Sequence, residues 1–544
     1  MHPTHAGPPA DTVQRGRILV AVLLGIFLSV LDQTIVATAL PVIATDLGGV
    51  DRFTWVTTAY LLTATVSIPF YGKLSDQVGR KPLLVAGILI FLAGSVLSGL
   101  AASMDMLIAS RALQGVGAGS LFPIGLAVIG DHYAPAERAR PQALFGAVFA
   151  LSAVLGPTLG GWLTEAGGWP WVFFLNVPIG LVTIALVARS LPGGSRPTAR
   201  PHVDVAGAVS LAVAIGLLLL GLTNKQSGEW RDPWVGGLLA ASMLATATFL
   251  FVEARAEEPI LPLGLFRDLT FAAAMVASLL VSVAFYGAVV FLPLWFQVVD
   301  GTRPSDAGVR SLALLSGLVV GAVAAGRLVA RTGRYRWLLM GASGLAILGF
   351  LLLGRLTPQT PMPLLGGAMF VAGLGLGPTF SVLTVVAQSS APPGAMGVAS
   401  STLTFVRQIG GAVGLALLGT VYSETVMATL PASLARHGVP EAARDALAVL
   451  DLGALTQVGG DLNGALLASL PGAAAATVHP VIGNVVEAVK VALTHGVTAT
   501  FIAAAIALIV ATAASFALRE VPLRGAREAG TRLIAPAAAQ EGLG

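Results

Sequence analysis

Apolar segments of about 20 residues recur along nearly the whole sequence, and they limit what the chain can fold into. A helix of about 20 apolar residues spans the ~30 Å hydrocarbon core of a bilayer. Charged residues make up 11% of the chain, against about 25% in soluble domains. The sequence therefore predicts an all-α integral membrane protein. We count fourteen spans: Ile18–Leu40, Thr54–Tyr71, Leu83–Ala102, Met106–Ile129, Gln142–Leu163, Val172–Val187, Val205–Leu222, Trp234–Val252, Phe271–Val298, Ala307–Gly326, Trp337–Leu356, Met362–Val386, Val398–Val421 and Gly496–Leu518.

The basic residues predict the orientation of these spans. Most of the 31 Lys and Arg residues fall in segments that lie inside if the N-terminus is inside, and positively charged loops stay in the cytoplasm. Both termini are therefore predicted to be cytoplasmic, and the protein is expected in the inner (cytoplasmic) membrane as a multi-pass protein surrounded by membrane lipids. Because the basic residues are scattered between apolar runs and form no basic face, we expect no nucleic-acid partner.

Two parts of the chain show an ordered internal similarity. The segment Gly72–Lys81 matches Gly326–Tyr335, and a row of alternate glycines occurs twice, as Gly115, Gly117, Gly119 and as Gly373, Gly375, Gly377. A same-direction duplication of six spans is typical of transporters whose halves rock about a central site. We expect a cytoplasmic N-terminus (1–17), a six-helix bundle (18–187), a linker with inserted helices seven and eight (188–268), a second six-helix bundle (269–518) with an outer loop (422–495) between helices thirteen and fourteen, and a cytoplasmic tail (519–544).

Five motifs stand in order at matching positions of this topology. They are Leu31–Pro41 in the first span, Gly72–Lys81 after the second, Arg111–Gly119 in the fourth, Leu155–Gly161 in the fifth and Phe174–Gly180 at the sixth. With these motifs the chain resembles the major facilitator superfamily over almost its whole length, and in particular its 14-span drug:proton antiporter branch (EmrB- and QacA-like exporters). The resemblance implies a major facilitator fold and export of drugs by alternating access, driven by the proton gradient, with no cofactor and no enzymatic activity.

The resemblance assigns roles to two of these motifs. In the loop motif Gly72, Asp76, Gly79 and Arg80 would form a gate, with Asp76 facing the N-terminus of a helix near Gly397 in the other half and Arg80 reaching a carboxylate such as Asp131. In the fifth span Gly156, Pro157, Gly160 and Gly161 would form the antiporter motif, where missing side chains let helices approach closely. The alternatives are positive-inside anchoring for the loop cations and ordinary helix packing for the glycines.

Asp32 is the carboxylate that lies well inside a span. A buried charge in the membrane is costly and marks a functional site by default. Desolvation favours the neutral carboxyl, whereas pairing with Arg111 in the fourth span favours the ionised one. We therefore expect Asp32 and Arg111 to couple protons to transport. A static pair that fixes helix register is the alternative, and the titratable residues at span ends, Asp300, Asp306 and Glu424, are expected to be solvated.

A substrate cavity is expected between the two halves, lined by polar and aromatic side chains. The candidates are Gln33, Thr34, Thr38, Tyr60, Gln114, Tyr286, Trp295, Gln297, Ser381, Arg407 and Gln408. Binding of a multivalent cation would need more acid than one buried Asp, so the sequence favours lipophilic neutral or monocationic amphiphiles.

The segment before the last span leaves a second function open. Pro480–Leu518 could form one helix of about 58 Å that projects outside the membrane, and Pro440–Leu450 is amphipathic. These features allow a lipid or glycolipid exporter of the same fold. A membrane sensor or enzyme is the third alternative, but the sequence has no HisGluXXHis helix, no phosphate loop and no Cys, so no metal site is expected. We expect the protein to act as a monomer.

Overall fold

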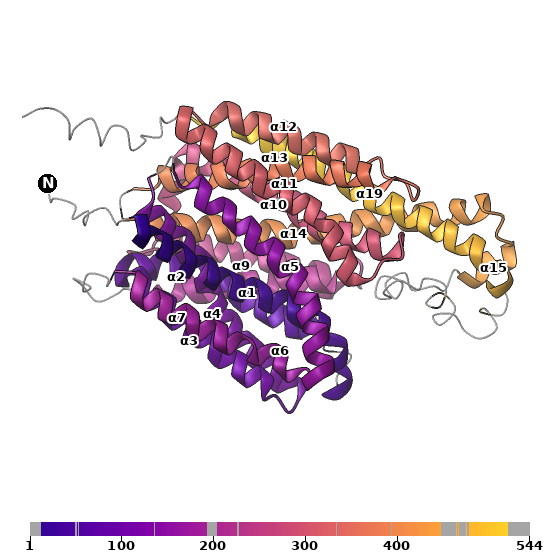
Figure 1. Ribbon diagram of the computed structural model, residues 1–544, viewed down its shortest axis with the longest axis horizontal. Coiled ribbons are helices and arrows are strands. Elements are labelled where there is room, and N and C mark those ends of the chain that lie inside the picture. The colour runs from indigo at the N-terminus through magenta and orange to yellow at the C-terminus, as the bar shows by residue number, and fades with distance from the viewer. Residues whose placement is uncertain are drawn as a thin grey trace, which may run out of the picture.

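The computed structural model describes residues 12–48, 52, 54–134, 137–192, 204–225, 228–332, 334–392, 394–447, 464, 466, 475 and 478–519. Every regular element among these residues is a helix, and most of the helices run alongside one another (Figure 1). The elements are α1 (Thr12–Asp46), α2 (Thr54–Val78), α3 (Arg80–Gly99), α4 (Met104–His132), α5 (Ala139–Gly167), α6 (Pro170–Phe174), α7 (Asn176–Ser190), α8 (Val205–Asn224), η1 (Pro233–Gly237), α9 (Leu238–Glu253), η2 (Leu263–Arg267), α10 (Leu269–Val298), α11 (Pro304–Thr332), α12 (Arg336–Leu353), α13 (Met362–Ser390), α14 (Met396–Arg436), α15 (Glu441–Leu447), η3 (His479–Val481) and α19 (Ile482–Ser515).

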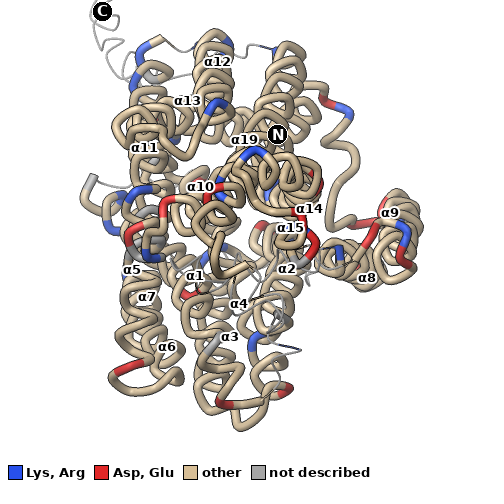
Figure 2. The backbone as a smooth tube through the Cα atoms, turned by 90° about the vertical axis from the view of Figure 1, so that its right-hand side faces the viewer, with Lys and Arg blue, Asp and Glu red and all other residues tan. Residues whose placement is uncertain are grey.

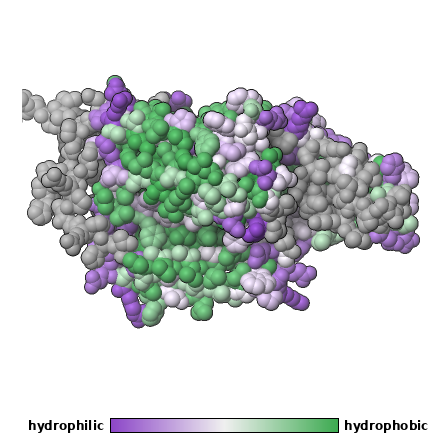
Figure 3. All heavy atoms as spheres, turned by 90° about the horizontal axis from the view of Figure 1, so that it is seen from below, coloured by the Kyte–Doolittle hydropathy of each residue, from purple (hydrophilic) through white to green (hydrophobic). Residues whose placement is uncertain are grey.

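Twelve helical segments of the described residues are long and apolar enough to cross a membrane. The pairs α6–α7 and η1–α9 each count as one of them, and α2 and α5 are not among the twelve. The surface agrees with this environment, because large apolar side chains such as Met243 and Leu244 are more than 70% exposed. In Figure 3 hydrophobic residues cover the middle of the molecule, while hydrophilic ones gather toward its ends. The chain is therefore a multi-pass membrane protein.

The alternate glycines place the same helices together in each half. Gly115 and Gly119 of α4 lie against the backbone of α2, and Gly117 lies against that of α3. In α13, Gly373 and Gly377 lie against the backbone of α11, and Gly375 lies against that of α12. A side chain at any of the six would overlap its neighbour, so the glycines permit backbone-to-backbone packing. The internal similarity seen in the sequence is thus repeated as α2–α3–α4 and α11–α12–α13.

Substitution of one of these glycines is expected to destabilise the protein. In Gly373→Val the new side chain would overlap Leu314 of α11, and because backbone cannot move aside easily, we expect a loss of about 3 kcal/mol. Gly366→Val on the same helix is the matched control, since a Cβ there meets nothing within 4 Å. Thermal melting of both purified variants checks the prediction. Equal melting temperatures for the two would contradict it.

Helices α8 and α9 form a pair at one side of the bundle, where α8 also packs on α2 and α14 (Figure 2). They follow the first six spans in the chain and precede α10. The sequence predicts these residues to be the inserted pair, and the pair lies beside the two halves.

The structure differs from the predicted outer loop at 422–495, because helices extend into this segment from both sides. Helix α14 does not end near Val421 but continues to Arg436, and α19 already begins at Ile482, so both ends of this segment are helical. The two extensions pack together, with Ser433 Oγ donating to the Ala488 carbonyl at 2.8 Å. They project beyond the bundle toward α15 (Figure 1). The amphipathic stretch predicted at 440–450 contains α15, and its last three residues lie outside the described part of the chain.

Candidate functional site

A buried ion pair joins α1 and α4. Arg111 Nη1 lies 2.7 Å from Asp32 Oδ2, and the side chains are 1% and 0% exposed. Because desolvation of either charge alone is costly, each holds the other in the membrane interior. The structure therefore brings together the two residues predicted to couple protons.

Two side-chain amides complete the surroundings of Asp32. Gln114 Nε2 and Asn176 Nδ2 each donate to Asp32 Oδ1 at 2.8 Å, and Arg111 also donates to Gln114 Oε1 at 2.5 Å. Three donors, from α4 and α7, are thus aimed at this carboxylate. A protonated Asp32 would need an acceptor, and Asn176 Oδ1 is a buried atom without a hydrogen-bond partner. Rotation of this amide would supply one. We call these four residues the Asp32 network.

Tyr60 of α2 separates the Asp32 network from a cavity. The Arg111 guanidinium carbon lies 4.2 Å from the centre of the Tyr60 ring, and the Tyr60 hydroxyl is 3.2 Å from Ser29 Oγ. Tyr60 and Ser29 both line the cavity. A ligand that moved Tyr60 would therefore act directly on the Arg111 side of the ion pair.

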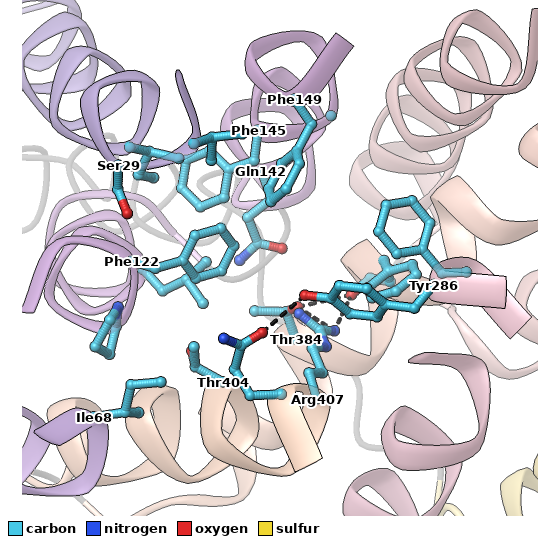
Figure 4. A pocket seen from close by; sticks show the side chains of 18 of the residues that line it. Ser29, Ile68, Phe122, Gln142, Phe145, Phe149, Tyr286, Thr384, Thr404 and Arg407 are labelled. Atoms are coloured by element: carbon cyan, nitrogen blue, oxygen red, sulfur yellow. Dashed lines mark hydrogen bonds between the residues drawn. The ribbon is translucent and has the colours of Figure 1, made fainter. Parts of the chain in front are cut away.

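The cavity has a volume of about 210 Å³ and lies between the two halves. Its walls come from α1, α2, α4 and α5 of one half and from α10, α11, α13 and α14 of the other. Figure 4 shows side chains from both halves facing this space. Six of the residues predicted from the sequence line it: Gln33, Tyr60, Tyr286, Ser381, Arg407 and Gln408.

The other five predicted residues lie elsewhere. Gln114 belongs to the Asp32 network, and Thr34 and Thr38 face α5. Trp295 is buried in the core of the second half, where its Nε1 donates to Thr494 Oγ1 at 3.2 Å, and Gln297 lies one residue before the end of α10. A polar or aromatic residue on a buried helix can face a neighbouring helix as well as the cavity, and an apolar span does not show which.

The antiporter motif packs α5 on α1. A Cβ at Gly156 or Gly160 would overlap Thr34 or Thr38, whose hydroxyls bond to nearby backbone carbonyls. Pro157 lies inside α5, where it removes a backbone donor. A Cβ at Gly161, by contrast, would meet nothing within 4 Å. Close packing against the helix that carries Asp32 thus depends on two of the three glycines.

This difference predicts unequal effects within the motif. Gly160→Val should push α5 away from α1 and lower transport by about tenfold or more, on the scale of 1–3 kcal/mol for overpacking. Gly161→Val should change transport little. Efflux assays on both variants at matched protein levels check this, and a larger loss in Gly161→Val would exclude the packing role.

The residues predicted to form the gate connect the two halves at the end of α2. The backbone N–H groups of Gly397 and Val398, at the start of α14, donate to Asp76 Oδ1 and Oδ2 at 2.8 and 2.9 Å. Arg80 lies 2.5 Å from Asp76 and 2.9 Å from Asp131. The carboxylate thus meets both a helix N-terminus and a guanidinium, each of which favours its charge.

Two glycines let the gate assemble. A Cβ at Gly72 would overlap Ser401 of α14 and approach the Gly397 carbonyl, so α2 and α14 meet here backbone to backbone. Gly79 has φ +102°, a conformation that favours glycine, and it makes the turn from α2 into α3 that brings Arg80 beside Asp76. The structure therefore contains the contacts that the family resemblance implies for Asp76 and Arg80.

Sequence reasoning did not single out several residues of the site. Asn176 stands in the motif Phe174–Gly180, but its role depends on a contact with α1 that the motif does not reveal. Gln142 of α5 and five phenylalanines also line the cavity: Phe122, Phe145, Phe149, Phe285 and Phe380. Phenylalanines in apolar spans give no signal that separates lining from packing.

Two helical bundles around a central cavity are an arrangement typical of secondary transporters. Residues 22–415 match the model of the Major Facilitator Superfamily, and the chain belongs to this family. It is accordingly a transporter and not an enzyme.

Similar proteins agree with this assignment. The chain is 37% identical over 409 residues to the multidrug transporter protein MdtP of Bacillus subtilis. The aligned residues make up 75% of each protein. It is 31% identical to the tetracenomycin C resistance and export protein of Streptomyces glaucescens, over 91% of this chain and 92% of the relative. A bacterial homologue of the lysosomal transporter Spinster, solved facing inward and unoccupied, shares the fold with a TM-score of 0.54, 17% identity and coverage of 94% and 98%.

Proposed function

We propose that the protein is a proton-coupled exporter of lipophilic drugs or amphiphiles in the cytoplasmic membrane, belonging to the 14-span antiporter branch of its family. Relatives named as a multidrug transporter and a resistance and export protein support export as the direction of transport. The observation that carries proton coupling is the fully buried Asp32–Arg111 pair, which is separated from the cavity by Tyr60. The proton gradient supplies the energy, no cofactor takes part, and a single chain is sufficient.

The proposal includes fourteen spans with both termini in the cytoplasm. Helices α2 and α5 are added to the twelve segments that are long and apolar enough to cross a membrane. At 25 and 29 residues they too are long enough to cross a bilayer. Both pack within the bundle, α2 on α4 and α5 on α1 and α11. On this topology α1–α7 form the first bundle, α8 and α9 the insertion, and α10–α14 with α19 the second bundle.

Coupling would proceed through the Asp32 network. A proton on Asp32 removes the charge that Arg111 faces, and the Asn176 amide can then rotate to accept from the protonated carboxyl. Arg111 is freed to shift against Tyr60, which changes the cavity wall. Proton binding to Asp32 and substrate binding to the cavity would thus favour different arrangements of the Asp32 network. Proton and substrate therefore compete, as exchange requires.

The gate would close the cytoplasmic side in the state seen here. Asp76 joins α2 to α14 across the two halves, and loss of this contact would allow that side to open. The matching position in the second half is Ala330, so the lock exists on one side only.

Efflux from proteoliposomes under an imposed pH gradient tests the proposed function. The substrates are rhodamine 6G, a lipophilic cation, and anthraquinone-2-carboxylate, an aromatic acid. Gradient-dependent export of either compound, abolished by a protonophore, is the expected result. Binding of these compounds without any gradient-dependent movement would contradict proton-coupled drug export.

One observation favours lipid export as a second function. The ends of α14 and α19 project beyond the bundle with α15, where they could guide acyl chains away from the membrane (Figure 1). Replacing residues 437–478 by a short linker separates the two functions. Drug export should survive this change, whereas a lipid exporter should lose activity and should copurify with bound lipid.

A further inference from the structure

Arg407 of α14 brings a positive charge into the cavity, and no carboxylate among the described residues pairs with it. Its Nη2 donates to the Phe380 carbonyl at 2.8 Å and to Thr384 Oγ1 at 2.9 Å, and both acceptors are neutral. Its Nε is buried without a hydrogen-bond partner. Among the described residues that line the cavity, Arg407 is the one with a charged side chain. Since a buried cation in a membrane is normally paired, the cavity lacks an anion.

Gln142 of α5 presents a second unsatisfied group to the same space. The side chain is 7% exposed and lines the cavity, yet neither Nε2 nor Oε1 has a hydrogen-bond partner. In Figure 4 its amide points into the cavity toward the region of Arg407 and Thr384. An unpaired buried amide costs about 1–3 kcal/mol, a cost that a ligand with polar groups removes. The two halves therefore each contribute one unsatisfied polar side chain.

Aromatic rings connect these two groups along the cavity wall. Phe122 lies 5.4 Å from Phe145 and 6.4 Å from Phe149, and Phe149 lies 6.4 Å from Phe285 of the other half. The row ends at Phe380, which is 5.2 Å from Phe285 and 4.7 Å from the Arg407 guanidinium carbon. Such a wall favours flat, apolar ligands, because aromatic rings pack well against one another.

We propose that the cavity selects aromatic acids, planar compounds whose carboxylate or phenolate pairs with Arg407 while a further polar group meets Gln142. The two N–H groups of Nη2 already have acceptors, so a carboxylate would pair with the remaining donors of the guanidinium, in a charge-assisted contact that is strong in a low-dielectric protein interior. This inference names the substrate class of the transporter and rests on the proposed function. It differs from the neutral or monocationic amphiphiles that the sequence favours, because the position of Arg407 in the cavity wall decides the sign of the charge.

Calorimetric titration of the full protein in lipid nanodiscs tests this inference without requiring transport. The probes are anthraquinone-2-carboxylate and its carboxamide, which share size and shape but differ in charge. Wild type should bind the carboxylate at least about tenfold more tightly, the scale of one charge-assisted contact. Arg407→Gln should abolish this preference while changing carboxamide affinity less than about threefold, and Arg407→Lys should restore part of it. Arg355→Gln, at an exposed position, is the matched control.

Gln142→Leu provides a second, independent variant. It should weaken both probes by a similar factor of about fivefold, because the amide bonds to polar groups irrespective of their charge. Equal affinity of wild type for the two probes, or binding of neither, overturns the inference. So does a charge preference that persists in Arg407→Gln.

The result can be separated from the test of the proposed function. Gradient-driven export of rhodamine 6G together with equal affinity for the two probes would overturn the inference about aromatic acids. It would still support proton-coupled drug export. Preference for the carboxylate without any gradient-driven movement would retain the inference about the cavity and remove proton-coupled export.

Discussion

Replacing Asp32 with Asn is expected to reduce gradient-driven efflux by about 100-fold or more, the scale of losing a proton-transfer group. Asn has the shape of Asp and its oxygen can still accept from Arg111, but it cannot take up a proton under these conditions. Substrate binding to the cavity should remain, because Asp32 does not line it. The measurement is the initial rate of efflux from proteoliposomes with and without a pH gradient.

Controls separate coupling from folding. Asp32→Asn leaves Arg111 without its counter-charge, which costs about 3–5 kcal/mol when a buried pair is broken, so melting temperature and protein level are measured for each variant. Asp32→Glu keeps the titratable group and should retain part of the activity. Asp105→Asn is the matched surface control, since its side chain is 74% exposed. Efflux by Asp32→Asn at the wild-type, gradient-dependent rate would rule out Asp32 as the proton carrier.

Replacing Asp76 with Asn is expected to open the gate. In the wild-type protein the Asp76 carboxylate accepts from two backbone N–H groups and faces Arg80. An amide would lose the charge and turn a donor toward one of these N–H groups, so the contact across the halves should weaken by about 1–3 kcal/mol. The closed state should therefore lose population by about tenfold or more, and transport should fall because one state of the cycle is no longer favoured.

Distances between spin labels measure this change directly. The sequence has no Cys, so labels can be placed at single introduced cysteines without removing native ones. Arg189 at the end of α7 and Arg331 at the end of α11 are exposed positions on the two halves. The Asp76→Asn variant should show a longer distance than wild type. Asp131→Asn, which removes a more exposed partner of Arg80, should show a smaller change in this distance. An unchanged distance in Asp76→Asn would contradict the gating role.

The sequence was most informative where a physical requirement acts on a local pattern. Apolar length predicts membrane helices, and the alternate glycines lie at places where backbones of neighbouring helices meet, as Gly117 and Gly375 show. Asp32 and Arg111 could be paired from sequence because an isolated charge in a span needs a partner and few candidates exist. The contact of Asp76 with Gly397 was predictable only through the resemblance to a family, since no spacing relates two residues 321 positions apart.

Directions of side chains could not be predicted. Thr34 and Gln33 are neighbours on α1, yet Gln33 lines the cavity and Thr34 packs on Gly156. In a helix that is apolar on all sides, periodicity does not distinguish the face toward the cavity from the face toward a neighbour. The extension of α14 to Arg436 was missed for a related reason, because its end is stabilised by packing on α19 and lies outside the apolar run.

Proton release on substrate binding tests the central claim most directly. Purified protein in nanodiscs, in weakly buffered solution with a pH indicator dye, is mixed with anthraquinone-2-carboxylate, which is already ionised at the working pH. If Asp32 exchanges its proton against substrate, wild type releases protons in proportion to the substrate bound, and Asp32→Asn binds substrate with no release. Substrate binding to wild type without proton release at any pH from 5 to 9, or equal release from Asp32→Asn, would contradict the account.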